Sequence, residues 1–251
     1  MSFNMEFGYP REAEKAKEER WPVLIPVGTM EYHSDHCPYG CDTLVAMGIA
    51  QKIAEKINAV VFPPIWYGVA SYAVGGPEKN TIQVDCDTFE SYIYSILKSL
   101  FRSGFNRKIY IIIAHQTEDY LPMTLACMKA AKKLTFEYLD ETQGLGWWGN
   151  NDNKEFYENL SATDNPWNWV RVIRANVITD GSETIKKLPA DHAGKYECSE
   201  LEYLWPGTIK LDRLGESGDW FAETAKETSV ELGKSIVCEK VETLIKMMAN
   251  E

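Results

Sequence analysis

In the stretch from Val23 to Ala50, VLIPVGTMEYHSDHCPYGCDTLVAMGIA, an apolar run gives way to a polar cluster and then to a helical pattern. The apolar run predicts a strand over residues 21–28 that is buried on both faces. Apolar side chains at helical spacing predict a helix over residues 43–57. The polar cluster between them holds two of the chain's four histidines and two of its six cysteines.

Strand-like and helical patterns alternate along the rest of the chain. Further strands are predicted over residues 59–66, 108–115 and 135–140 and within 169–178. Helices are predicted over residues 88–102, 119–134 and about 219–249, and a short helix that Pro206-Gly207 stops is predicted within residues 193–207. A long loop is predicted over residues 144–169, which hold four of the eight tryptophans. The alternation indicates an α/β fold with a mostly parallel sheet that helices cover on both faces.

The bulk composition favours one globular domain over residues 1–251, since 45% of the residues are hydrophobic and 25% are charged. The formal net charge of −11 argues against nucleic-acid and membrane-surface partners, because such a surface repels phosphates and anionic lipids. The sequence contains no apolar run of about 18 residues and no secretory signal pattern, so we expect a cytoplasmic protein.

The cysteines do not form a recognisable framework. Six cysteines among 251 residues are too sparse for a disulfide scaffold. Cys37 and Cys41 are spaced C-x3-C, but no second pair of cysteines or histidines completes a zinc-finger pattern. We therefore expect reduced thiols that act mostly as small buried residues, without a chemical role.

All four histidines stand at positions that suggest a function. His33 and His36 follow the first strand, His115 ends the strand over 108–115, and His192 precedes a helix. Ligands of parallel α/β sheets bind beyond the carboxyl ends of the strands. Histidines at two strand ends, with carboxylates beside them, predict a shared metal site.

Several carboxylates near these histidines are candidate ligands. Glu31 and His33 are two residues apart on an extended segment, so their side chains point to one side. Asp42, at the start of a helix, either caps that helix or bridges two cations about 3.5–4 Å apart. Glu118 either complements a helix dipole or acts as a further ligand. A mixed set of histidines and carboxylates suits Zn, Mn or Fe.

The segment DHAGKYECSE adds two candidate catalytic residues, His192 and Glu197. Glu197 is either a solvated helix carboxylate, a metal ligand, or a base that acts on the attacking water. Asp35 and His36 are either ligands or partners that orient the ligands. Lys195 is interpreted as a solvated side chain, and a role in the site is the alternative because Lys195 is close to it in sequence.

Three segments, the stretch from Glu31 to Thr43, the segment around His115 and the segment from His192 to Glu200, together resemble the creatininase (creatinine amidohydrolase) family. The family opening, Glu-x-His-x-x-His-x-Pro followed by Asp-Thr and a helix, is matched in register by Glu31, His33, His36, Pro38, Asp42 and Thr43. The segment IIIAHQTED places His115 on the histidine of the family's Asn-Gly-His-Gly-Gly-Asn segment. HAGKYECSE is similar to His-Ala-Gly-x-x-Glu-Thr-Ser, with His192 at the catalytic histidine and Glu197 at the acid.

The resemblance implies an α/β/α sandwich, two divalent metal ions and a homo-oligomer, which is a hexamer in the type enzyme. Glu31, Asp42 and His115 would hold one ion. His33 and Asp42 would hold the other with a further carboxylate, whose family position is occupied here by Thr117. Glu118 and Glu197 are the candidates to replace that carboxylate.

The resemblance also implies hydrolysis of a small cyclic substrate, most often at an amide C–N bond. Leu188 and Pro189 stand where the type enzyme has a Trp-Asp pair that binds creatinine, which argues against creatinine itself. Hydrolysis of a ring ketone or inosose-type carbohydrate is one alternative, and a non-catalytic metal-binding or small-molecule-binding protein is another. The tryptophan-rich loop over 144–169 either lines the ligand pocket or serves packing or a subunit interface.

Overall fold

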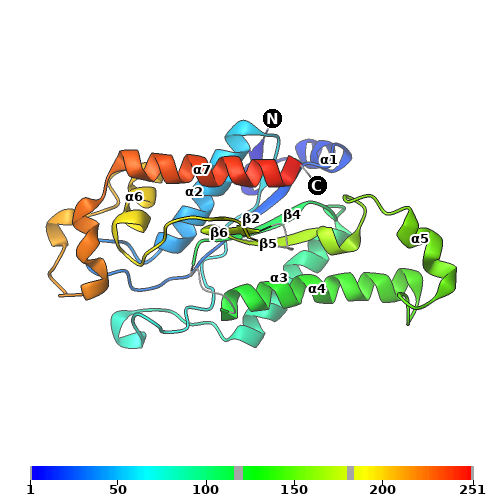
Figure 1. The fold of residues 1–251 in the computed structure, drawn as a ribbon, viewed down its shortest axis with the longest axis horizontal. Helices are drawn as coiled ribbons and strands as arrows, with labels where there is room; N and C mark the ends of the chain where they lie inside the picture. The colour runs from blue at the N-terminus through cyan, green and yellow to red at the C-terminus, as the bar shows by residue number, and fades with distance from the viewer. Residues whose placement is uncertain (1, 116–120, 180–183, 250–251) are drawn as a thin grey trace.

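The computed structural model describes residues 2–115, 121–179 and 184–249. Within these ranges, a seven-stranded sheet lies between two layers of helices (Figure 1). This arrangement confirms the predicted α/β sandwich. No helix of the described residues is both long enough and apolar enough to cross a membrane.

The strand order in the sheet is β1-β3-β2-β4-β5-β6-β7. The first five strands in this order pair in parallel, and β6 and β7 add an antiparallel edge. The strands are β1 (Phe3–Asn4), β2 (Val23–Val27), β3 (Val60–Val61), β4 (Ile109–Ile113), β5 (Val170–Arg174), β6 (Val177–Thr179) and β7 (Thr184–Lys187). The central strands β2 and β4 are wholly buried, as their unbroken apolar runs predict.

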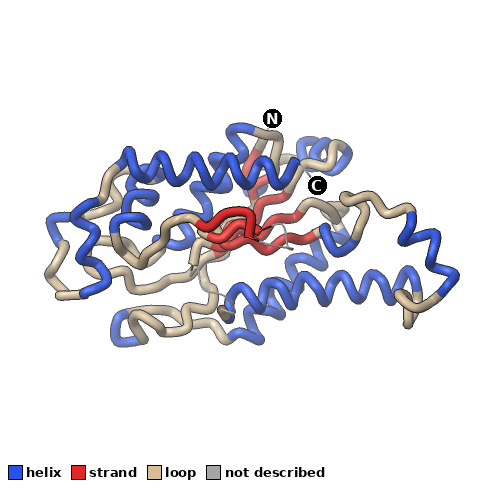
Figure 2. The backbone as a smooth tube through the Cα atoms, in the orientation of Figure 1, coloured by secondary structure: helices blue, strands red, loops and turns tan. Residues whose placement is uncertain are grey.

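Helices cover both faces of the sheet (Figure 2). One face carries α2 (Cys41–Lys56), α6 (Lys195–Leu204) and α7 (Val230–Ala249), and the other carries α3 (Cys86–Arg102) and α4 (Pro122–Gln143). Two shorter helices, α1 (Pro10–Glu18) and α5 (Lys154–Glu158), lie toward the end of the molecule away from α6.

The two-residue period of β4 divides the core into two parts. Tyr110 and Ile112 pack into the cluster that α2, α6 and α7 complete. Ile109, Ile111 and Ile113 pack into the opposite cluster with α3 and α4.

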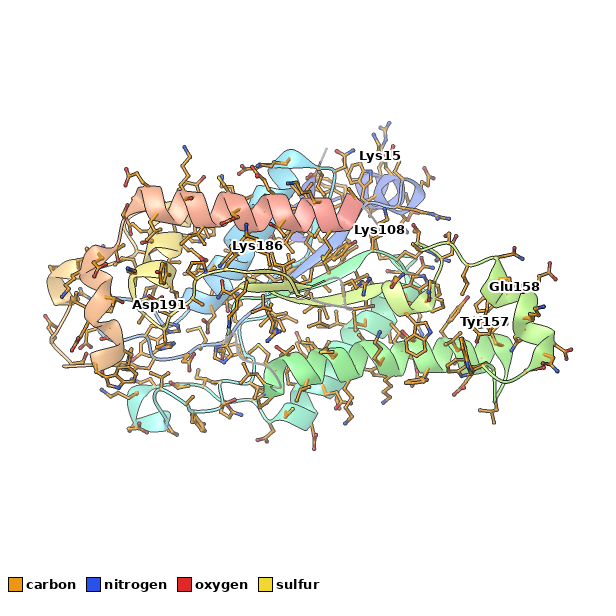
Figure 3. All side chains as sticks on the ribbon, viewed as in Figure 1. Lys15, Lys108, Tyr157, Glu158, Lys186 and Asp191 are labelled. Carbon is orange, nitrogen blue, oxygen red and sulfur yellow. The ribbon has the colours of Figure 1, made fainter. Side chains whose placement is uncertain are left out.

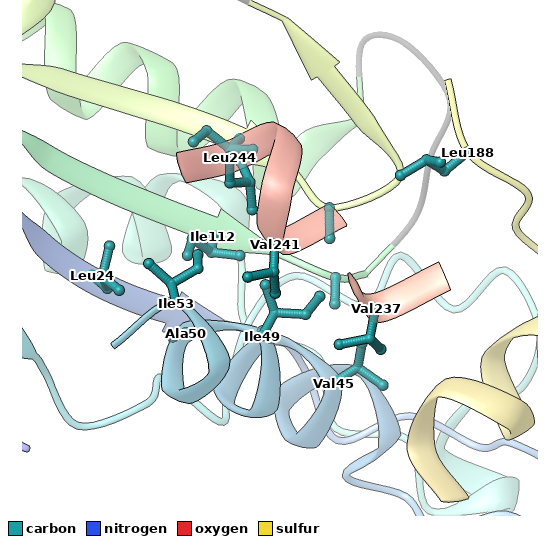
Figure 4. Packing of buried hydrophobic residues seen from close by; sticks show 14 of the residues in the cluster. Leu24, Val45, Ile49, Ala50, Ile53, Ile112, Leu188, Val237, Val241 and Leu244 are labelled. Carbon is teal, nitrogen blue, oxygen red and sulfur yellow. The ribbon is translucent and has the colours of Figure 1, made fainter. Parts of the chain in front are cut away.

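The face of α2 that packs on the sheet also meets α7. Figure 4 shows Val45 and Ile49 of α2 beside Val237 and Val241 of α7, with Ile112 of the sheet close by. All five side chains are at least 95% buried, and burying each such side chain stabilises the fold by about 1.5–3 kcal/mol. This packing fixes the start of α2 against the sheet.

The predicted strand over 135–140 is wrong, because these residues continue α4. Their aromatic and β-branched composition favours a strand. However, the buried positions in this part of the chain, Ala131, Leu134, Thr135 and Leu139, recur at helical spacing. Thr135 also donates a hydrogen bond through Oγ1 to the Ala131 carbonyl, one turn earlier.

Two other predicted elements are shorter than expected. The run over 59–66 forms a strand only at Val60–Val61, because Pro63 and Pro64 have no N–H to donate to a sheet. The helix predicted over 219–249 begins at Val230, after a 3-10 segment over Trp220–Glu227. The irregular loop over 144–169 is confirmed, with α5 as a short element inside it.

The tryptophan-rich loop lies at the amino end of the strands. Ile109, at the start of β4, donates a hydrogen bond to the carbonyl of Trp169, which directly precedes β5. Figure 3 shows Tyr157 and Glu158 of this region at the opposite end of the molecule from Asp191, which precedes α6. The carboxyl ends of the strands therefore lie away from the tryptophans.

Candidate metal centre

The carboxyl end of β2 lies against the first turn of α2. A Cβ at Gly28 would come within 2.4 Å of the Thr43 backbone nitrogen, so only glycine allows this close approach. The contact brings Asp42, in the first turn of α2, beside the segment that follows β2. Asp42 does not cap α2, because the N-cap residue is Gly40 and no side chain caps the helix.

One buried cluster joins Glu31, Asp42 and His115. His115 Nδ1 lies 3.0 Å from Asp42 Oδ2 and 3.1 Å from Glu31 Oε2. The three side chains come from segments that follow β2 and β4 and from the start of α2, and all three are at least 98% buried. Their ligand atoms lie within 4.8 Å of one another, so one cation can reach all three.

A second cluster surrounds His33. Its Nδ1 donates to the Glu31 carbonyl oxygen at 2.9 Å, which leaves Nε2 as the basic nitrogen. This Nε2 lies 3.5 Å from both Asp42 Oδ1 and Glu197 Oε2. The ligand atoms of His33, Cys41 and Glu197 lie within 4.8 Å of one another. Asp42 thus presents one carboxylate oxygen to each histidine.

The donor atoms fit divalent cations. His33 Nε2 is buried and has no hydrogen-bond partner in the part of the chain that the structure describes. Metal–ligand bonds of about 2.0–2.1 Å place tetrahedral ligands about 3.3 Å apart, close to the separations of 3.0–3.5 Å in both clusters. Buried carboxylates gathered in this way require cations or protons to balance their charge.

The charges in the site move the pKa values of both histidines. Burial lowers the pKa of His33, but Glu197 and Asp42 outweigh it and raise that pKa to about 10. The pKa of His115 rises to about 10 in the same way, with Asp42 as the main charge that opposes burial. Burial raises the Asp42 pKa, but the two histidines more than compensate, so this pKa lies below its ordinary value. In the absence of metal, protons therefore occupy the nitrogens that face the carboxylates.

His192 lies directly against His33. The two rings stack with centroids 4.2 Å apart and an interplanar angle of 28°. His192 Nε2 donates to the Tyr32 carbonyl oxygen at 2.9 Å, so Nδ1 is its basic nitrogen. Burial and the neighbouring His33 lower the His192 pKa to about 4, which leaves the ring neutral at pH 7.

Glu197 is fixed at the amino end of α6. Its Oε2 accepts a 2.7 Å hydrogen bond from the Ala193 backbone N–H. The Asp191 carboxylate accepts from the backbone N–H groups of Tyr196 and Glu197, at 3.0 and 2.9 Å. Burial raises the Glu197 pKa to about 8, although His33 opposes the shift.

A pocket of about 250 Å³ opens onto the two clusters. Its lining residues are Glu31, Ala73, Val74, Ala114, His115, Asn176, Ala190, Asp191, His192 and Glu197. The sequence reasoning missed Asn176 and Asp191. The position of Asn176, two residues past the end of β5, is the signal that would have found it.

Other candidate residues lie away from the two clusters. His36 Nε2 donates to the Ala193 carbonyl oxygen at 2.9 Å, so His36 holds the segment before α6 rather than facing the carboxylates. Asp35 is exposed, and Lys195 forms a 3.1 Å ion pair with Glu227, which fits its interpretation as a surface residue. Glu118 lies outside the described residues.

The structure also shows where the side chains of the tryptophan-rich loop and the six cysteines lie. The Trp167 and Trp147 rings pack together at 6.1 Å, and Trp169 packs on Tyr138 at 4.6 Å, so the loop serves packing within this chain. All six cysteines are free thiols, as expected. The sulfur of Cys41 lies within 4.8 Å of the ligand atoms of His33 and Glu197, so Cys41 is a further candidate ligand that the sequence did not indicate.

Comparisons with known proteins show which family and which fold this chain shares. A family model described as creatinine amidohydrolase matches residues 10–242. A curated 3-dehydro-scyllo-inosose hydrolase from Thermotoga maritima is 32% identical over 104 residues, which make up 41% of this chain and only 32% of that protein. Creatinine amidohydrolase from Pseudomonas putida is 29% identical over 197 residues, 76% of this chain and 67% of that protein.

Solved creatininase structures share the fold over the whole chain. A mutant creatininase of the Zn-Zn type superposes with a TM-score of 0.73 at 18% identity, and a structure described as creatininase Mn with 0.72 at 19% identity. Each comparison covers 100% of this chain and 98% of the solved one. The match of the family model over residues 10–242 shows the relationship directly: this chain belongs to the creatininase family, whose members named here are hydrolases.

Proposed function

We propose that the protein is a hydrolase that holds two divalent metal ions and directs a water molecule at the carbonyl carbon of a small uncharged ring. Cleavage of an amide C–N bond is the first candidate reaction. The observation that carries the proposal is the position of the buried Asp42, with one oxygen facing His115 and the other facing His33.

Glu31, Asp42 and His115 would hold one ion, and His33, Asp42 and Glu197 would hold the other. Zn, Mn and Fe all accept such a mixture of nitrogen and oxygen ligands. A pair of ions bound there would lower the pKa of a water molecule and polarise a carbonyl oxygen. Cys41 would give the His33 cluster one more donor, a sulfur atom, which suits Zn best.

His192 supplies the proton transfer. Its neutral ring accepts a proton at Nδ1 and passes it to the leaving nitrogen, while the Tyr32 carbonyl holds Nε2–H and the ring orientation. Stacking against His33 keeps the ring beside the clusters. Glu197, held by the Ala193 N–H, orients the attacking water or takes its proton.

The pocket lining favours an uncharged substrate. Glu31, Asp191 and Glu197 contribute carboxylates, and none of the described lining residues is a lysine or arginine. The described lining therefore offers no lysine or arginine to pair with an anionic group of a substrate. No tryptophan lines the described part of the pocket, and Leu188 is buried in the core, which supports a substrate other than creatinine.

A ring ketone of the inosose type is the second candidate. The hydrogen-bond acceptors of the pocket suit a ring that carries hydroxyl groups, and the Thermotoga maritima relative is a hydrolase of an inosose. The non-catalytic alternative is not supported, because the named relatives are hydrolases.

A turnover panel tests the proposal. The protein, loaded with Zn or Mn, is incubated with cyclic amides (creatinine, hydantoin, succinimide) and with inososes, and the products are identified by mass spectrometry. We expect ring opening of at least one non-creatinine amide, lost on chelation and restored by metal. Turnover of inososes alone would favour the second candidate, and no turnover of any ring would contradict the proposal.

A further inference from the structure

Asn176 is the third polar residue at the carboxyl edge of neighbouring parallel strands. It follows β5, as Glu31 follows β2 and His115 follows β4, and these strands are adjacent in the sheet. Two backbone hydrogen bonds hold the turn that contains it. The Ala175 N–H donates to the Ile113 carbonyl at 2.7 Å, and the Leu188 N–H donates to the Asn176 carbonyl at 2.9 Å.

Among the described residues, the side-chain oxygen of Asn176 has no hydrogen-bond partner. Oδ1 is buried and accepts no hydrogen bond, although Asn176 lines the pocket together with Glu31, His115 and Glu197. A buried carbonyl oxygen without a donor destabilises a protein, and such oxygens in native structures call for a specific explanation.

The usual local reasons for an asparagine in a tight turn do not apply here. Asparagine often tolerates a left-handed backbone, but Asn176 is not among the residues with positive φ. Asparagine also accepts from a backbone N–H two residues on, yet Oδ1 makes no such bond. These local features of the turn therefore do not explain the unpartnered oxygen.

Three neighbouring polar residues each have a hydrogen-bond partner within the chain. Both Asp191 oxygens accept backbone N–H groups at the start of α6. Glu197 accepts from the Ala193 N–H, and His192 donates to the Tyr32 carbonyl. Asn176 Oδ1, by contrast, has no hydrogen-bond partner among the described residues, so a donor that reached it would find its acceptor unoccupied.

We propose that Asn176 Oδ1 accepts a hydrogen bond from an N–H or O–H on the ring atom next to the carbonyl that is attacked, and so selects the substrate. The inference rests on the proposed function, because it assumes that a ring carbonyl faces the two clusters. It assigns Asn176 a specificity role and makes a donor beside the carbonyl a requirement of the substrate.

The proposal also explains why a ring would be preferred over an open chain. An open-chain secondary amide is trans, so its N–H points away from its C=O. A small ring holds the amide cis, so both groups point to one side and can reach one wall of the pocket. A hydroxyl next to a ring ketone is held near the carbonyl in the same way.

A buried water molecule is the competing partner for Oδ1. Asn176 also lines a cavity of about 10 Å³ with Glu200 and Lys240, and this is close to the volume that one water molecule needs. A water in that cavity would satisfy Oδ1 whether or not a substrate is bound. The two explanations differ in whether Asn176 discriminates between ligands.

Matched probes separate the two explanations. Dissociation constants of the Zn-loaded protein are measured by titration calorimetry or ligand-observed NMR for succinimide against N-methylsuccinimide, and for 2-hydroxycyclohexanone against 2-methoxycyclohexanone. The first pair tests an N–H donor and the second an O–H donor. We expect the wild-type protein to prefer the donor-bearing member of at least one pair by about tenfold.

Three variants complete the test. Asn176→Leu removes the acceptor at similar volume. It should bring the ratio of the two dissociation constants in each pair close to one, with unchanged metal content. Asn176→Asp keeps an acceptor oxygen and should retain the preference. Asn159→Ala, on the exposed loop after α5, should behave as the wild type.

A preference that survives in Asn176→Leu, or a wild-type protein that binds both members of each pair equally, would overturn the inference and leave the proposed function standing. Absence of binding for all four probes would overturn both. If Asn176→Leu does not fold, loss of the preference in Asn176→Asp would overturn the inference as well, because that variant keeps the acceptor.

Discussion

The imidazole ring of His192 stacks on that of His33, with centroids 4.2 Å apart. His33 directs Nε2 at two carboxylates, whereas His192 has its own hydrogen bond to the Tyr32 carbonyl. In the proposed function, His33 would bind metal and His192 would transfer protons. Their roles should separate on mutation.

We expect His192→Ala to lose turnover by about 10²–10⁴-fold, because a positioned general acid–base group contributes that much. Metal content should stay at the wild-type value, since His33 keeps its own bond to the Glu31 carbonyl. Steady-state kinetics and elemental analysis of the same preparation check both statements. Unchanged turnover would remove His192 from the mechanism.

Asp191→Ala should weaken both stability and activity. The Asp191 carboxylate accepts two backbone N–H groups at the start of α6, and loss of such a cap costs about 0.5–2 kcal/mol. Because Glu197 lies in this turn, kcat should fall while KM changes little. Asp191→Asn, which keeps one acceptor oxygen, should be milder in urea unfolding and in kinetics. Equal effects of the two variants would contradict the capping role.

The buried ion pair of Glu200 and Lys240 gives a stability prediction. Lys240 is 1% exposed, and its Nζ lies 2.5 Å from Glu200 Oε1. Lys240→Met should destabilise the protein by about 3–5 kcal/mol, because it leaves Glu200 buried and unpaired. The double variant Lys240→Met, Glu200→Leu should recover most of the loss in urea unfolding. A double variant as unstable as the single one would show that packing, not charge, sets the cost.

The chelated protein should become less stable as the pH rises from about 6.5 to 10. His33 and His115 have pKa values raised to about 10 in the folded chain, from 6.5. The two protonated histidines stabilise the folded state fully below pH 6.5, and this stabilisation is lost as the pH rises through 10. Glu197, with its pKa raised to about 8, changes stability in the same direction.

Thermal unfolding in EDTA at a series of pH values measures this slope. The metal-loaded protein is the control and should show a flatter profile, because bound metal takes the place of the protons. A chelated Tm that rises over this pH range would contradict the prediction.

Much of the site follows from the sequence through the geometry of parallel strands. Glu31, His33 and His115 stand at the ends of two apolar runs, and β2 and β4 are neighbours in the sheet, so the structure brings these residues together. The location of Asp42 depends on Gly28, which allows α2 to start directly against the end of β2. The spacing of the residues alone does not reveal that contact.

Other features depend on tertiary packing. The aromatic and β-branched residues over 135–140 favour a strand locally, but the helical spacing of the buried positions in α4 decides the outcome. Asn176 resembles an ordinary turn residue in the sequence, and only the structure shows its unpartnered Oδ1. In the sequence, Cys41 looks like half of a C-x3-C pair that no second pair completes, and only the structure shows that its sulfur lies near His33.

The number of metal ions per chain in wild-type protein and in Asp42→Ala, measured by elemental analysis after loading with Zn or Mn, tests the account most directly. Because Asp42 faces both histidines, it should be needed for both ions. We predict two ions per wild-type chain and fewer than one in Asp42→Ala, with a folded far-UV spectrum for both. Two ions retained in Asp42→Ala would contradict the account.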